Sequence, residues 1–152
     1  MIGLSITKDM LFLLIAFLAG VAMAGQGTMN SALGKAIGLS ESTFVVHLTA
    51  TLAMAAVLIL GLGDGNWSNY DSIPWYYYFG GLIGVGITYG VVISIAKLGA
   101  AIATTSIIVG QVLTACLLDH FGIFGLEKSP LSWLKLLGVG LLALGAKLLL
   151  GK

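Results

Sequence analysis

Five long apolar runs, separated by short polar segments, constrain this chain more than any other feature of its sequence. A helix needs about 20 apolar residues to cross a hydrocarbon core about 30 Å thick. The runs are continuously apolar rather than alternating, which favours helices over barrel strands. We therefore predict an all-α integral membrane protein with five transmembrane helices, at residues Met10–Asn30, Thr43–Leu62, Trp75–Ala96, Ala100–Leu118 and Leu131–Leu150.

The composition supports a membrane protein and excludes several other classes. Hydrophobic residues make up 59% of the chain and charged residues 9%, whereas a soluble domain carries about 25% charged residues. The net charge of +1 gives no reason to expect nucleic acid as a partner. Cys116 is the single cysteine, so an internal disulfide and a thiolate metal cluster are excluded. We expect membrane lipid as a partner and neither a metal nor a cofactor.

The connections between the runs are too short to hold an extramembrane domain, which predicts one transmembrane domain over residues 1–152. Ser129 and Pro130 provide a cap residue before a proline at the start of the fifth helix. The segment Ala22–Ala24 also resembles a signal-peptide cleavage site. The apolar run continues past it to Gln26 and Asn30, which favours a mature membrane helix.

Polar residues inside the apolar runs are the candidates for function, because such groups usually face protein or a water-filled cavity. Gln26 and Asn30 are four residues apart and share one helix face. Each such residue has two interpretations, a substrate cavity or a hydrogen bond between helices. The predicted cavity residues are Gln26, Asn30, Tyr89, Thr104 and Gln111, with Gln111 central in its run.

Small residues at helical spacing predict faces for close helix packing. One stripe in the first run contains Gly20, Ala24, Gly27 and Ser31. The third run contains two GxxxG pairs, Gly80 with Gly84 and Gly86 with Gly90.

Three titratable residues are candidates for proton linkage. Histidine titrates near neutral pH, and His47 lies about one turn into the second predicted helix. Asp119 and His120 end the fourth predicted helix, where the helix dipole disfavours an anion. A solvated helix end is the simpler interpretation of this pair.

No Asp or Glu lies in the middle of an apolar run, although a proton-coupled exchanger of the small multidrug type normally needs such a carboxylate. The sequence also lacks a nucleophile–base–acid set, a Walker loop and a metal-spaced histidine cluster. We therefore expect that the protein is not an enzyme.

Three segments carry a family resemblance. Gly110–Gly125, with its GQ…LLDHFG pattern, Gln26–Asn30 followed by Leu33 and Gly34, and Lys97–Ala101 resemble the DUF606 (YdcZ-like) family of small inner-membrane proteins. That family belongs to the drug/metabolite transporter superfamily, whose five-helix unit occurs singly, in pairs or fused into ten helices. The resemblance implies transport in a bacterial inner (cytoplasmic) membrane, without indicating the substrate.

These features together predict a small secondary transporter that exports a small molecule or metabolite. Five helices alone hardly line a pathway, so we expect a second copy of the chain as partner. The alternative is a non-transporting membrane assembly factor or the hydrophobic subunit of a larger complex, in which the polar residues serve packing only.

The lysines predict that the chain inserts in both orientations. Lysine and arginine near helix ends set orientation, and the chain has no arginine. With five helices, Lys8, Lys128 and Lys135 fall on one side, and Lys35, Lys97, Lys147 and Lys152 on the other. So small a bias favours an antiparallel, dual-topology homodimer that works by alternating access.

Overall fold

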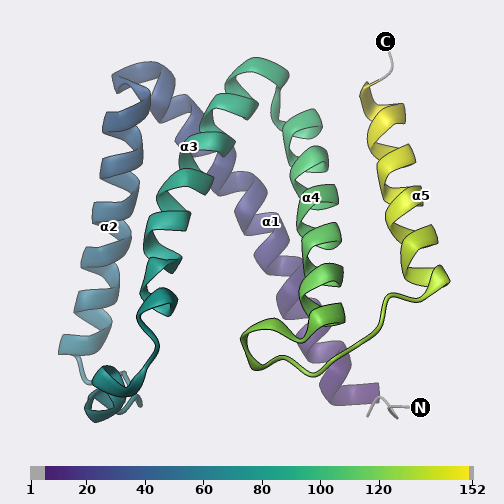
Figure 1. Cartoon of the computed structure of the whole chain (residues 1–152). Coiled ribbons are helices and arrows are strands. Elements are labelled where there is room, and N and C mark those ends of the chain that lie inside the picture. The colour runs from purple at the N-terminus through teal and green to yellow at the C-terminus, as the bar shows by residue number, and fades with distance from the viewer. Residues whose placement is uncertain (1–5, 151–152) are drawn as a thin grey trace. The chain divides into compact units, whose positions relative to one another are not determined.

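The computed structural model describes residues 6–150, with the side chains of residues 10–149, and every regular element in that range is helical (Figure 1). Lys8 and Lys152, which enter the orientation argument, lie outside the described side chains. The α-helices are α1 Ile6–Ile37, α2 Leu39–Ile59, α3 Gly80–Leu98, α4 Ala100–Phe121 and α5 Trp133–Leu150; the short 3₁₀ helices are η1 Trp67–Ser72, η2 Trp75–Phe79 and η3 Ile123–Gly125.

The helices form two compact units, Met1–Ala96 and Lys97–Lys152. In the first unit, α1 and α2 pack against each other as a hairpin (Figure 1). Side chains of α3 contact both helices. In the second unit, α4 packs against α5.

The first connection is much shorter than predicted. Residues 31–42 were expected to link two helices, yet α1 continues to Ile37 and α2 begins at Leu39. The whole turn is Gly38, with φ of 104°, a conformation that costs little only for glycine. The side chain of Glu41 lies against Gly38 where a Cβ would stand. The polar residues of this segment therefore lie in the helix ends rather than in a loop.

Two other helix starts differ from prediction. Residues Trp75–Phe79 form the 3₁₀ helix η2, so the α-helical part of the third run begins at Gly80. The fifth helix begins at Trp133, and Ser132 rather than Ser129 caps it, since the Ser132 Oγ accepts the Lys135 N–H at 3.3 Å. Pro130 is followed by two non-helical residues. It therefore lies within the connection and does not open the helix.

The apolar helices are exposed along most of their length, which identifies lipid as their solvent. Within residues 10–149, four helical segments are long and apolar enough to cross a membrane: Met10–Ile37, Leu39–Ile59, Trp75–Leu98 and Ala100–Phe121. Their mean hydropathy is 1.9 to 2.0, and at most 11% of each span is buried within the chain. Water does not tolerate apolar surface on this scale, so the chain is a multi-pass membrane protein.

Candidate functional site

Small residues of α1 lie against side chains of α3 in the first unit. A Cβ on Gly27 would lie 3.0 Å from both Val91 and Ile95, and one on Gly34 would lie 2.7 Å from the Val92 Cγ1. Ser31, between these glycines, is only 3% exposed. The α1 face on which Gly27 and Ser31 lie is thus the surface that α3 contacts.

The other glycines predicted to pack are placed differently. Gly84 lies beside His47, whose Cε1 would be 3.6 Å from a Cβ there. A Cβ on Gly20, Gly80, Gly86 or Gly90 would meet nothing within 4 Å, and Ala24 is half-buried. The contacts within the described chain therefore leave these four glycines unexplained.

The five predicted cavity residues are divided between the two units. Gln26, Asn30 and Tyr89 belong to α1 and α3 of the first unit, whereas Thr104 and Gln111 belong to α4 of the second. Asn30 and Thr104 are half-buried, and the other three are exposed. Among residues 10–149, none of the five side chains forms a hydrogen bond. Their polar atoms are thus available to groups outside their own unit.

His47 forms a polar contact between α2 and α3 that the sequence analysis missed. Its Nε2 lies 3.2 Å from the Thr88 Oγ1, and the tautomer of the ring decides which atom donates. Because α2 begins at Leu39, His47 lies about two turns inside the helix rather than one. Thr88 follows Gly84 by four residues on α3, so both lie on the face toward the imidazole.

The signal for Thr88 was present in the sequence as a hydroxyl within the third apolar run. The neighbouring Tyr89 is among the predicted cavity residues, because its hydroxyl needs a polar partner in a membrane. Only the contact with His47 distinguishes Thr88 from threonines that bond their own helix, such as Thr51, which donates to the His47 carbonyl.

Asp119 and His120 close the connection between α4 and α5. The Ser129 N–H donates to the Asp119 carbonyl at 2.9 Å, and the Leu131 N–H donates to the His120 Nδ1 at 3.2 Å. The Lys135 ammonium donates to the Ser129 Oγ at 2.7 Å and to its carbonyl at 3.3 Å. These bonds tie the end of α4 to the start of α5, and we call them the α4–α5 strap.

We expect that His120→Ala lowers the thermal stability of the protein in detergent, because the Leu131 N–H loses its acceptor. One such hydrogen bond contributes about 1 kcal/mol. His120→Asn is the matched control, since its side-chain oxygen can occupy a position close to that of Nδ1. His120→Asn should therefore melt close to the parent, and His120→Ala at a lower temperature. Equal melting temperatures for the parent and both variants would exclude this role.

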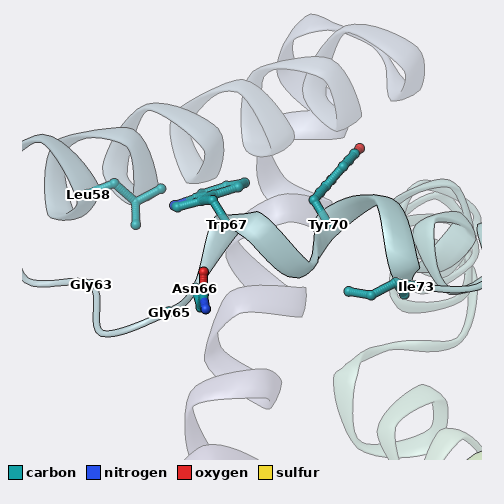
Figure 2. Close-up of a pocket in the computed structure, with 7 residues that line it drawn as sticks. All are labelled: Leu58, Gly63, Gly65, Asn66, Trp67, Tyr70 and Ile73. Carbon is teal, nitrogen blue, oxygen red and sulfur yellow. The ribbon is translucent and has the colours of Figure 1, made fainter.

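A pocket of about 400 Å³ lies at the connection between α2 and α3 (Figure 2). The rings of Trp67 and Tyr70 stand on η1 with their centroids 6.5 Å apart, and Leu58 at the end of α2 faces Trp67. The complete lining is Leu58, Gly63, Gly65, Asn66, Trp67, Tyr70 and Ile73. The sequence analysis gives no sign of this pocket.

No group of three or more His, Cys, Asp or Glu side chains within the described part of the chain could hold a metal ion.

The long exposed apolar helices define a multi-pass membrane protein. Residues 11–148 match the model of the family described as "Putative inner membrane exporter, YdcZ", and the chain belongs to this family. No curated protein and no solved structure matches the chain. The resemblance that the sequence motifs indicated is thus confirmed, and the description of the family is consistent with a transporter.

Proposed function

We propose that this chain is one half of a secondary transporter that exports a small molecule across a bacterial inner membrane. The observation that carries the proposal is membership of an exporter family over residues 11–148. The structure supplies a physical reason in the same direction. An amide that lacks a hydrogen-bond partner in a lipid environment is costly, and Gln26 and Gln111 are both exposed on apolar helices.

In this proposal α5 is a fifth transmembrane span. Its 18 residues, Trp133–Leu150, correspond to about 27 Å of helix, close to the thickness of the hydrocarbon core. Lys135 and Lys147 are its charged residues and lie near its two ends, where long cationic side chains reach the interface.

The translocation cavity is proposed to form between two copies of the chain. Its lining would be the five side chains that have no hydrogen bond within their own unit: Gln26, Asn30, Tyr89, Thr104 and Gln111. The open glycines Gly20, Gly80, Gly86 and Gly90 would allow close approach of the partner's helices.

For coupling to protons we propose His47 as the first candidate. It is half-buried and bridges two apolar helices through Thr88. Asp119 and His120 lie at a helix end and take part in the α4–α5 strap, which gives both a structural role.

We expect the two copies to insert in opposite orientations, because the lysines on the two sides differ by only one. The test places a single cysteine at Asp64, which is exposed, in a Cys116→Ala background. An impermeant thiol reagent applied to intact cells should label about half of the molecules, as dual insertion requires. Lys97→Cys, in the last turn of α3 on the expected opposite side, is the control and should also be labelled by about half. Complete labelling at one position and none at the other would show a single orientation and exclude the antiparallel dimer.

The ligand is found by screening metabolites and drugs for an increase in the melting temperature of purified protein, since a ligand that binds only the folded state stabilises it. Ligands that stabilise the parent and not Gln111→Leu would support the cavity. Stabilisation by no small molecule, together with copurification of a fixed protein partner, would favour an assembly factor or a subunit of a larger complex.

A further inference from the structure

We propose that the pocket at the α2–α3 connection binds the ammonium group of an organic cation, with the faces of Trp67 and Tyr70 as its principal contacts. The site lies wholly within residues 58–73, so binding there does not depend on the transport function proposed above.

Two aromatic rings and two apolar side chains line the pocket. The rings of Trp67 and Tyr70 are inclined by 33° with centroids 6.5 Å apart, and both project from η1 in Figure 2. Leu58 and Ile73 complete the apolar part of the lining. A cation over the face of Trp or Tyr gains about 0.5–2 kcal/mol, and apolar walls suit the alkyl substituents of a quaternary ammonium.

Contacts within the segment support Tyr70 and the start of η1. Tyr70 stacks on Tyr78 with centroids 4.8 Å apart, and the Tyr78 hydroxyl donates to the Tyr70 carbonyl at 2.5 Å. The Asn66 Oδ1 accepts from the Ser68 N–H at 3.0 Å and from its Oγ at 2.6 Å, which fixes the start of η1. A site that is already ordered costs less to occupy than one that must form on binding.

The charge around the pocket favours a cation. The sequence contains no lysine or arginine between Lys35 and Lys97. Asp64 lies between the two glycines that line the pocket, and Asp71 directly follows Tyr70. Both carboxylates are exposed, and within residues 10–149 no lysine forms an ion pair with either of them. A ligand with positive charge is attracted to this segment and an anion is repelled.

The test measures binding of choline to the full chain purified in a maltoside detergent, by isothermal titration calorimetry. The neutral isostere 3,3-dimethyl-1-butanol has the same shape without the charge. We expect it to bind about tenfold more weakly than choline or worse. Equal binding of the two compounds, or no heat with choline, would overturn the proposal.

Variants locate the binding site. Trp67→Leu keeps an apolar side chain and removes the aromatic face, so it should weaken choline binding by about tenfold. Asp64→Asn combined with Asp71→Asn should weaken it in a salt-dependent manner. Trp75→Leu is the matched control, because Trp75 is equally exposed, at 71%, and does not line the pocket. Loss of choline binding in Trp75→Leu to the same extent as in Trp67→Leu would overturn the assignment.

The source of the ammonium group is distinguished in nanodiscs. If the natural ligand is a lipid headgroup, choline should bind more weakly in phosphatidylcholine nanodiscs than in phosphatidylglycerol nanodiscs, because the lipid competes. A free organic cation as ligand predicts the same choline affinity in both. Either result supports an ammonium site, whereas choline binding that Trp67→Leu leaves unchanged in both lipids would contradict it.

Discussion

Gly34→Leu should prevent the first three helices from packing and should be the most destabilising single change considered for this chain. A Cβ at Gly34 would lie 2.7 Å from the Val92 Cγ1 and 3.2 Å from the Ser42 Oγ. Val92 is 3% exposed and Ser42 is fully buried, and a β-branched valine has little freedom to turn away. Overpacking of this kind costs about 3 kcal/mol or more.

The measurement is the melting temperature and the folded yield of the purified variant in detergent. Gly20→Leu is the matched control, because Gly20 lies on the same face of α1 two heptads earlier and a Cβ there meets nothing within 4 Å. It should unfold at the temperature of the parent in a monomeric preparation. Equal effects of the two substitutions would show that α1, α2 and α3 do not meet at Gly34.

Gln111→Leu should fold normally and abolish transport. Gln111 is exposed in the middle of α4 and has no hydrogen bond within residues 10–149, so leucine removes no contact within the chain and suits a lipid environment. The proposed cavity loses its central amide, and the ligand's polar groups would lose that partner on binding.

Transport by parent and variant is compared at equal amounts of folded protein in liposomes. Gln111→Asn is the control that retains the amide, and it should keep part of the activity. Leu113→Ala, at an exposed apolar position two residues away, should leave the rate unchanged. Full activity in Gln111→Leu would remove Gln111 from the cavity and make interhelical packing its most direct explanation.

The helices were predictable because the length of an apolar run follows from the thickness of the bilayer. The first turn was not, because its polar residues Lys35 and Glu41 suggested a loop. In the structure both lie in helix ends, and Gly38 alone makes the turn through its positive φ. The chain has 22 glycines, and nothing in the sequence indicates that Gly38 is the one that forms the turn.

The sequence predicts which residues are candidates for the site, but not which groups their side chains contact. A polar group in an apolar run is visible in the sequence, but the groups it meets depend on how helices pack. His47 required Thr88 from another helix, and His120 required the Leu131 N–H from the following connection. The pocket beside Trp67 required the turn from α2 into η1. These contacts join residues 9 to 41 positions apart, for which a periodic pattern gives no information.

The central claim, that the chain transports a small molecule, is tested most directly by flux through liposomes that contain only this protein. A compound selected by its thermal stabilisation of the protein is loaded inside, and its release is followed with and without a proton gradient. We expect release that requires the protein, saturates with compound concentration and is absent with Gln111→Leu. If the protein still binds the compound but release is no faster than from protein-free liposomes, the claim that the chain is a transporter is contradicted.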